Sequence, residues 1–274
     1  MSEDALWPGG AQCAVVLSFD FDAETVWLAR DTDNRAKLAM LSFGHYGAKV
    51  GVPKILEFLR EEALRATFFV PGWSAETYPE RMAAIAGDGH EIAHHGYLHY
   101  RPDPADEPAM LEEIERGLET LAGVGVTPKG YRAPGGESCD FLLRLLVEKG
   151  IVYSSSFKDD VMPYRHRLGD GRPGPVEIPE QPALDDWNYG FTHLRSPQPL
   201  YTKDAHLAIW REEFREIYRW GGVFILVMHP QITGRPLRLA VLREFIAFTR
   251  RFPNVWYATA LEVAEAFIAR EAAG

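Results

Sequence analysis

Short apolar runs alternate along the chain with longer stretches in which apolar residues recur at helical spacing. Residues 13–22 are mostly apolar until Asp20 and Asp22 end the run, a pattern typical of a strand buried on both faces. Residues 52–63 then repeat with helical period, and the apolar run 66–70 follows. This succession predicts a strand, a covering helix and a second strand.

The same alternation continues to the end of the chain. Further strands are predicted at residues 90–94, 131–132, 151–155, 223–228 and 255–259, and further helices at residues 82–86, 107–121, 141–149, 207–219, 237–250 and from 259 onward. Thr77 and Glu80 have the spacing of a capping box before one helix. Thr259 and Glu262 have it before the last. The alternation predicts an α/β fold whose parallel strands close into a TIM-like barrel.

Two long segments interrupt this alternation, at residues 26–51 and 156–199. In a barrel of this kind the connections after the strands build the functional site. Connections of this length are usually functional or intermolecular. We therefore expect both segments to be loops at the rim that carries the site.

Composition narrows the class of protein. A chain of 274 residues with 46% hydrophobic residues can form one large core, and we predict a single domain over residues 1–274. A net charge of −10 argues against binding a nucleic-acid backbone. This net charge does not exclude a pocket that is locally basic. The two cysteines are far apart, and no export signal or membrane-length apolar run is present, so a cytoplasmic protein without a membrane partner is expected.

Polar clusters follow four of the predicted strands. They are Asp20 with Asp22, His95 with His99, Arg132 with the following Pro-Gly-Gly, and His229 with Pro230. Each alone is weak evidence, because turn-capping aspartates, solvated histidines and buried core histidines are common. Their recurrence at one kind of position predicts that they meet at one rim of the barrel.

Asp22, His95 and His99 have the composition of a divalent-metal site. Two carboxylates at the end of a buried strand need a cation or hydrogen-bond donors, and two imidazoles can complete the ligand set. His94 is an alternative second ligand. Such a set suits zinc, nickel, cobalt and iron alike.

The ordered motifs Ser-Phe-Asp-Phe-Asp at 18–22, His-Gly-Tyr-Leu-His at 95–99, Arg-Ala-Pro-Gly at 132–135 and Leu-Val-Met-His-Pro at 226–230 span most of the chain. With them the sequence resembles the polysaccharide deacetylase superfamily, also called the NodB-homology or carbohydrate esterase family 4 group. The resemblance implies a distorted barrel of seven or eight strands with one metal ion, usually zinc. It also implies a hydrolase of non-peptide carbon–nitrogen bonds that acts on an N-acetylated sugar.

The matched positions carry the family's roles over to six residues: metal ligation by Asp22, His95 and His99, the general base by Asp20, the general acid by His229, and orientation of the base by Arg132. The resemblance also assigns an oxyanion donor to the backbone amide of Gly135, where many relatives have tyrosine. Trp73 and Trp187 are candidate walls of the substrate pocket. Asp159 or Asp160 is a candidate partner for Arg132 or His229.

One departure from the common pattern widens the range of substrates. Phe21 separates Asp20 from Asp22, whereas most relatives have adjacent aspartates. This spacing resembles the branch of peptidoglycan-deacetylase-like proteins, cyclic imidases and a metal-independent allantoinase. The alternatives are therefore ring opening of a cyclic imide or ureide, with or without metal, and a non-catalytic carbohydrate-binding relative. The same branch suggests a homodimer or homotetramer.

Overall fold

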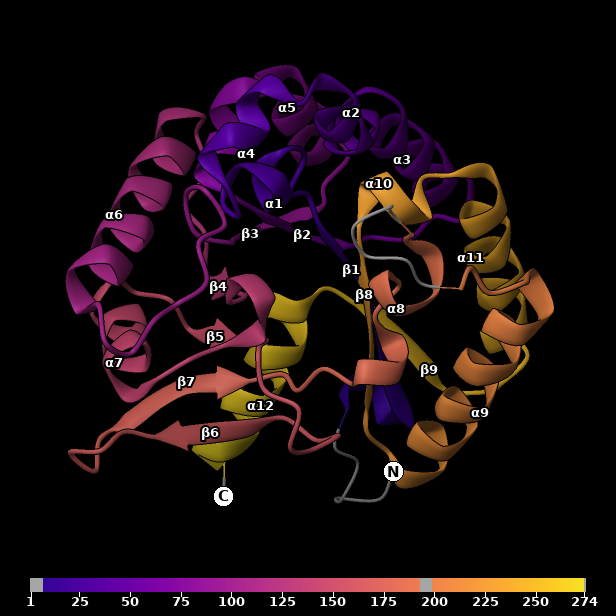
Figure 1. Ribbon diagram of the computed structural model, residues 1–274. Coiled ribbons are helices and arrows are strands. Elements are labelled where there is room, and N and C mark those ends of the chain that lie inside the picture. Colours follow the sequence, from indigo (N-terminus) through magenta and orange to yellow (C-terminus); the bar gives the residue numbers. More distant parts are fainter. Residues whose placement is uncertain (1–6, 193–198, 274) are drawn as a thin grey trace.

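The computed structural model describes residues 7–192 and 199–273, in which one curled sheet is surrounded by helices (Figure 1). Its strands are hydrogen-bonded in the order β6-β7-β5-β4-β3-β2-β1-β8, and β9 pairs with β1. They are β1 (Cys13–Asp20), β2 (Thr67–Val70), β3 (Glu91–His94), β4 (Gly130–Tyr131), β5 (Tyr153–Ser154), β6 (Tyr164–Arg167), β7 (Pro173–Glu177), β8 (Val223–Met228) and β9 (Val255–Ala258). Every pair is parallel except β6 with β7.

Strand β1 pairs with three other strands, and all eight of its residues are buried. Strand β8 pairs along one edge of β1, while β9 and β2 share the other edge, β9 near its start and β2 near its end. A strand with neighbours on both edges and side chains packed on both faces requires a continuous apolar run. This explains why β1 and β8 were the clearest strands in the sequence.

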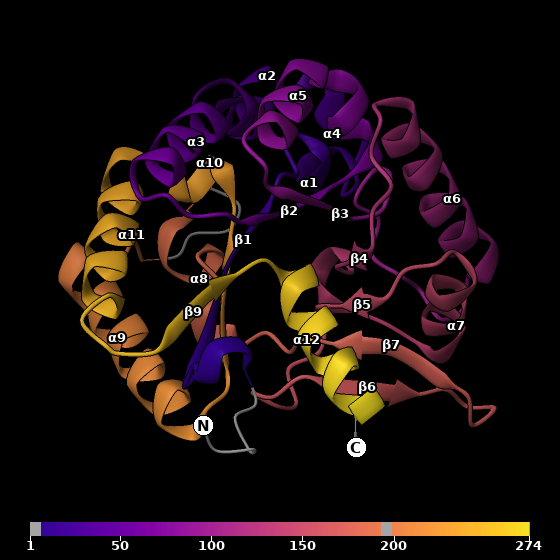
Figure 2. The ribbon, with the colours of Figure 1, turned by 180° about the vertical axis from the view of Figure 1, so that it is seen from behind.

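The expected α/β fold of the distorted-barrel type is confirmed. The hydrogen-bonded path ends at β6 and β8, so the curled sheet is a half-barrel. Beside β8, the N–H of Asp186 donates to the carbonyl of Val227 at 3.0 Å, so the segment before α8 (Trp187–Gly190) extends this edge. Seen from behind, α12 (Ala260–Ala273) lies across the inner side of the curve, where Val263 packs into a cluster that contains Val16 and Val176 (Figure 2).

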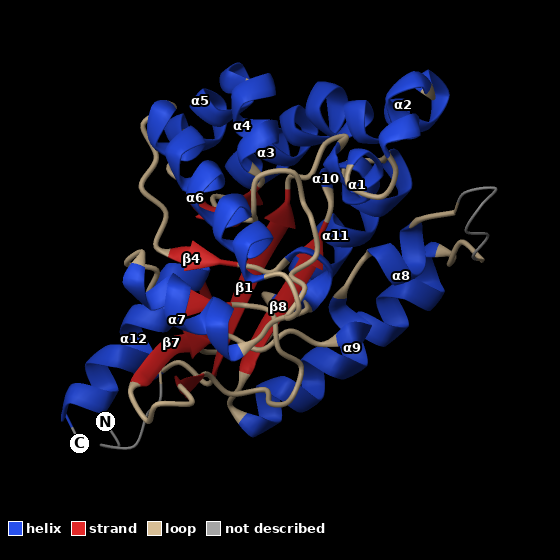
Figure 3. Ribbon diagram, turned by 60° about the vertical axis from the view of Figure 1, so that its left-hand side comes forward, coloured by secondary structure: helices blue, strands red, loops and turns tan. Residues whose placement is uncertain are grey.

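Most of the helices cover the outer side of the strands, whereas α12 lies inside the curve (Figure 2 and Figure 3). The helices are α1 (Thr25–Leu28), α2 (Leu38–Tyr46), α3 (Val52–Glu61), α4 (Gly72–Thr77), α5 (Pro79–Gly87), α6 (Glu107–Gly123), α7 (Asp140–Glu148), α8 (Trp187–Gly190), α9 (Lys203–Trp220), α10 (Pro230–Thr233), α11 (Pro236–Thr249) and α12 (Ala260–Ala273). Helix α6 buries Met110, Ile114 and Leu121 on one stripe, as its helical spacing predicts. Within residues 7–192 and 199–273, every helix is too short or too polar to span a bilayer.

The two segments expected to be loops contain regular structure. The first holds α1 and α2, and the second holds the hairpin β6–β7 and α8; residues 193–198 lie outside the described part of the chain. Helix α2 buries only Gly44 of its nine residues, so its sequence has no apolar stripe to reveal it. Strand β6 consists of Tyr, Arg, His and Arg, and β7 contains two prolines and a glycine, so neither has the sequence pattern of a buried strand.

One of the two capping boxes is confirmed. The Thr259 N–H donates to Glu262 Oε2 at 2.9 Å, and the Glu262 N–H donates to Thr259 Oγ1 at 3.3 Å, at the start of α12. The other prediction is wrong, because Thr77 is the last residue of α4 and α5 begins at Pro79 without a side-chain cap. Spacing alone does not distinguish a helix start from the junction of two helices.

Candidate active site and metal centre

The ends of β1 and β3 bring Asp22, His95 and His99 together. His95 Nε2 lies 3.5 Å and His99 Nε2 lies 3.7 Å from the same carboxylate oxygen, Asp22 Oδ1. All three ligand atoms lie within 4.8 Å of one another. Ligands at about 2.0–2.1 Å from a tetrahedral ion are separated by roughly 3.3 Å, so the set is close to the size that one ion requires.

The protonation of this set also fits a cation. Asp22 is fully buried, burial raises its pKa to about 8, and its Oδ1 has no hydrogen-bond partner among the described residues. The two imidazoles are neutral, because burial lowers the pKa of both. His95 Nδ1 donates to the Arg132 carbonyl at 2.7 Å, which leaves Nε2 as the ligating nitrogen. A divalent ion would compensate the negative charge of the buried Asp22 carboxylate and would accept the Nε2 lone pairs of the two imidazoles.

A second acidic group nearby fits an ion less well. Asp185, Asp186 and His229 also lie within ligand distance of one another. However, both oxygens of Asp186 already accept hydrogen bonds, at 2.7 Å from His229 Nδ1 and at 2.5 Å from Thr233 Oγ1. This group is therefore a hydrogen-bonded partner of His229.

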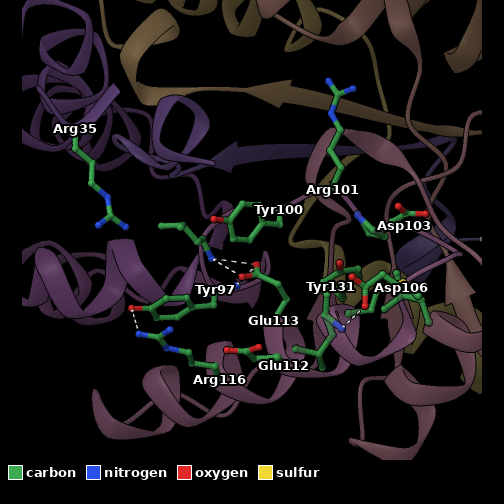
Figure 4. A pocket seen from close by; sticks show the side chains of 17 residues that line it. Arg35, Tyr97, Tyr100, Arg101, Asp103, Asp106, Glu112, Glu113, Arg116 and Tyr131 are labelled. Carbon is green, nitrogen blue, oxygen red and sulfur yellow. Dashed lines mark hydrogen bonds between the residues drawn. The ribbon is translucent and has the colours of Figure 1, made fainter. Parts of the chain in front are cut away.

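His99 is held by a strained turn that α6 supports. Its φ is +66°, a left-handed conformation that histidine adopts uncommonly. Glu113 accepts the N–H groups of Tyr97 and Leu98 at 3.0 Å each, and these bonds are drawn in Figure 4. Glu113 was not identified from the sequence, because nothing in the pattern of α6 separates it from the other acidic residues of its polar face.

Asp20 lies beside this set with one oxygen fixed and the other directed inward. Arg132 Nη1 donates to Asp20 Oδ1 at 2.6 Å and to Ser18 Oγ at 2.9 Å, while its Nε donates to the Ser155 carbonyl at 3.0 Å. Asp20 Oδ2 lies 3.8 Å from His95 Nε2. Burial acts to raise the pKa of Asp20, but Arg132 and His95 outweigh it, so the pKa is lowered and the carboxylate stays ionised.

His229, which follows β8, faces Asp20 from the opposite wall. Its Nε2 lies 4.0 Å from Asp20 Oδ2. Burial alone would lower its pKa, but Asp186, which is bound to its Nδ1, raises the pKa to about 10. The ring is therefore a cation that holds a proton at Nε2.

The carboxylate that binds His229 is that of Asp186, and neither Asp159 nor Asp160, the two candidates from the sequence, has this role. Asp159 instead accepts the hydroxyl of Tyr164 at 2.8 Å, and Asp160 accepts the N–H groups of Val161 and Met162. Two adjacent aspartates before Trp187, in a segment expected at the rim, were the one sequence signal that could have identified Asp186.

The candidate ligands, the proposed base and acid, and Arg132 line a cavity of ≈220 Å³: Asp20, Asp22, His95, His99, Arg132 and His229. Gly135 and Trp187 contribute to its wall, and Trp187 meets His229 edge to face at 5.1 Å between ring centroids. Trp73 does not line it; its indole packs near Leu98 and against Tyr78. His94 also points elsewhere, because its ring lies against α6 and Tyr131.

A second, larger cavity of ≈520 Å³ lies between α6 and the turn that precedes it (Figure 4). Arg35, Asp106 and Arg116 are among its lining residues. Gly96 and Tyr97 line it as well, so it lies behind the turn that carries His99. Arg101 lines both cavities and marks the boundary between them.

Comparison with known proteins identifies the family of this chain. The family model described as polysaccharide deacetylase matches residues 31–154. A crystal structure of a Mycobacterium smegmatis protein assigned to the polysaccharide deacetylases is 40% identical, covers 97% of this chain and 93% of its own, and has a TM-score of 0.89. This chain belongs to the polysaccharide deacetylase family.

Two further relatives of this polysaccharide deacetylase differ in what they show. The peptidoglycan deacetylase of Helicobacter pylori is 29% identical over 286 residues, which cover 93% of this chain and 96% of that protein. The Puue allantoinase structure is 22% identical over 96% of this chain and 92% of its own, with a TM-score of 0.82, and shows a shared fold alone. The resemblance noted in the sequence is confirmed, as is the class of hydrolases that act on non-peptide carbon–nitrogen bonds.

Proposed function

We propose that this polysaccharide deacetylase removes the acetyl group from an N-acetylated sugar with the help of one divalent ion. The observation that carries the proposal is the convergence of three groups from distant strands. A candidate ligand set, an ionised Asp20 and a protonated His229 face one cavity from different walls. Amide hydrolysis requires a base and an acid on either side of the reacting carbonyl.

Asp22, His95 and His99 would hold the ion, which we propose to be zinc. A divalent ion bound there supplies Lewis-acid polarisation of the amide carbonyl. Asp22, whose pKa burial raises to about 8, would release its proton when the ion binds and contribute the negative charge, and the two neutral imidazoles would contribute lone pairs.

Asp20 would act as the general base. Its Oδ2 faces the cavity and can accept a proton from the attacking water. Arg132 holds Oδ1 and favours the ionised carboxylate, which fixes both the direction and the protonation state of the base. This arrangement supports proton removal at Oδ2.

His229 would act as the general acid. An amine is a poor leaving group until its nitrogen is protonated, and His229 lines the cavity with a proton at Nε2, 4.0 Å from Asp20 Oδ2. Asp186 stabilises the imidazolium through Nδ1. The N–H of Gly135 makes no hydrogen bond within the described part of the chain and would be available to the developing oxyanion.

The test is acetate release from N-acetylglucosamine oligosaccharides by the zinc-loaded protein, beside ring opening of succinimide and allantoin. We expect acetate release alone, and a loss of about 100-fold or more in kcat for Asp20→Asn and for His229→Ala. Ring opening without acetate release would overturn the proposal. Acetate release that survives both substitutions would overturn the assigned roles.

A further inference from the structure

Four permanently cationic side chains line the catalytic cavity, although the chain as a whole carries a net charge of −10. Two of them, Arg132 and Lys158, are ion-paired with carboxylates of the same cavity at 2.6 Å and 2.7 Å. The other two, Arg30 and Arg101, have no carboxylate partner within residues 7–192 and 199–273. The cavity therefore contains two guanidinium groups that no carboxylate binds directly, although Asp22 and Asp185 also line it.

Arg30 lies on the wall next to the proposed acid. Its guanidinium carbon is 6.0 Å from the centre of the Trp187 ring, and that ring packs against His229. Burial lowers the pKa of Arg30, and the charge of Arg101 lowers it further, so the two guanidinium groups repel each other across the cavity. A bound anion between them would convert this repulsion into two attractions.

Arg101 lies across the Pro134–Gly136 turn on the facing wall. A Cβ at Gly135 would come within 2.5 Å of Arg101 Nε and 3.1 Å of its Cδ, and the φ of Gly135 is +70°. The glycine therefore leaves the space that the arginine occupies. In Figure 4 the Arg101 side chain extends away from Tyr131 and Asp106, the side chains of the neighbouring cavity.

We propose that Arg30 and Arg101 bind a carboxylate of the substrate beside the amide, so that the enzyme selects acidic N-acetyl sugars over neutral ones. This inference rests on the proposed deacetylase function and narrows its substrate class. Guanidinium groups bind carboxylates with paired, directional hydrogen bonds, which gives selectivity as well as affinity. The carboxylate would lie on the side of the leaving amine, because Arg30 is next to the ring that contacts His229.

Three substrates isolate the effect of charge. N-acetylmuramic acid and N-acetylglucosamine share the ring and the acetamide and differ by a lactyl carboxylate, and the methyl ester of the acid keeps the added bulk without the charge. We expect kcat/KM for the acid to exceed that for either neutral sugar by about tenfold or more. Equal values for the acid and its ester would overturn the inference.

Arg30→Gln and Arg101→Gln test the two side chains directly. Both arginines are exposed at the surface, so the fold should tolerate the change, and thermal unfolding verifies it. We expect each variant to lose most of the preference for the acid, measured as the ratio of kcat/KM for the acid to kcat/KM for its methyl ester. Arg35→Gln is the matched control, because Arg35 is another exposed arginine that lines only the neighbouring cavity. A preference that survives in both variants, or that Arg35→Gln abolishes equally, would overturn the assignment.

Calorimetric binding to the Asp20→Asn protein separates this inference from the proposed function. Tighter binding of the acid than of its ester, lost in the Arg30→Gln background, supports the carboxylate site even if no acetate is released. Acetate release from all three sugars at equal rates supports the deacetylase function and overturns the site. Absence of both selective binding and turnover overturns both.

Discussion

Asp186 sets the protonation state of His229. Its carboxylate accepts three hydrogen bonds, from His229 Nδ1, from the His229 N–H and from the hydroxyl of Thr233. The residue is fully buried, so these donors have no water to replace it. The function of the proposed acid therefore depends on a residue 43 positions earlier in the chain.

Replacing Asp186 with asparagine should impair the proposed acid. An asparagine side chain has one acceptor oxygen and one NH2 donor, so its NH2 group would face a group that donates to Asp186 in the native protein. The His229 imidazolium would also lose the negative charge beside it. We expect kcat to fall by about 100-fold or more, and the free energy of unfolding to fall by about 1–3 kcal/mol. Steady-state kinetics and urea unfolding measure the two effects.

Asp159→Asn is the matched control for this change. Asp159 was a candidate for the same role, yet it lies at the surface and contacts Tyr164. We expect its kcat to stay within about twofold of wild type. Equal losses in the two variants would contradict the role given to Asp186.

At the scale of elements, α6 supports the turn that carries His95 and His99. Gly117 lies where the helix meets this turn, and a Cβ there would come within 2.2 Å of His94 Cε1 and 2.7 Å of the Gly96 carbonyl oxygen. Glu113, one turn earlier on the same helix, binds the turn through its carboxylate. The position of the metal ligands thus depends on close packing of a helix that contributes no ligand.

Gly117→Ala should push α6 away from this turn. We expect a loss of about 1–3 kcal/mol or more in the free energy of unfolding, since the contact is with backbone as well as with a buried ring. Zinc affinity should fall too, because His95 and His99 would move. Urea unfolding and zinc titration measure both.

Gly123→Ala on the same helix is the control. Nothing lies within 4 Å of the added methyl group, so we expect a gain of about 0.4–1 kcal/mol and unchanged zinc affinity. Similar effects in the two variants would show that helix propensity, rather than packing at the turn, governs position 117.

The packing of α9 on α11 contains an acid-sensitive contact outside the active site. His206 is buried between Tyr189 and Trp210, and its Nδ1 accepts a hydrogen bond from Arg238 at 3.1 Å. Burial and the charge of Arg238 lower the pKa of His206 to about 3. The folded protein therefore keeps this ring neutral at pH values where an exposed histidine is charged.

Stability should fall on acidification because of His206. Its unfolded-state pKa is about 6.5, so between pH 6.5 and 3 the unfolded chain binds a proton that the folded chain excludes. This group lowers the free energy of unfolding by about 1.4 kcal/mol for each pH unit in that window. Urea unfolding at several pH values should give a shallower decline for His206→Gln, and parallel declines would contradict the assignment.

At the scale of the whole molecule, the candidate metal site exists only in the folded chain. Asp22 follows β1, whereas His95 and His99 follow β3, and the two strands meet through β2. An ion that binds this set binds the native state and leaves the unfolded chain without a comparable site. Metal binding and global stability are therefore linked.

Removal of metal should lower the melting temperature as well as activity. At a zinc concentration about 1,000 times Kd, binding stabilises the native state by about 4 kcal/mol, which corresponds to roughly 10 °C for a chain of this size. Differential scanning calorimetry before and after chelation measures the shift. In Asp22→Asn the shift should disappear, and full activity with an unchanged melting temperature after chelation would contradict the metal assignment.

Local sequence patterns were sufficient for the buried strands, for the main covering helices and for the polar residues at the strand ends. The apolar runs of β1 and β8 and the stripe of α6 are visible because burial imposes a period on each of them. Asp20 and Asp22 were recognisable since carboxylates at the end of such a run need a cation. That residues 1–274 form a single domain, and that the protein forms dimers or tetramers, stay predictions.

The tertiary structure alone decided which distant groups support the site. Asp186 reaches His229, and Arg101 reaches the turn at Gly135, through contacts between segments that no local period relates. Helix α2 and the β6–β7 hairpin also lacked a signal, because their environment comes from neighbours rather than from their own pattern. Periodicity records which face of an element is buried, whereas the partner of a side chain depends on how the whole chain is folded.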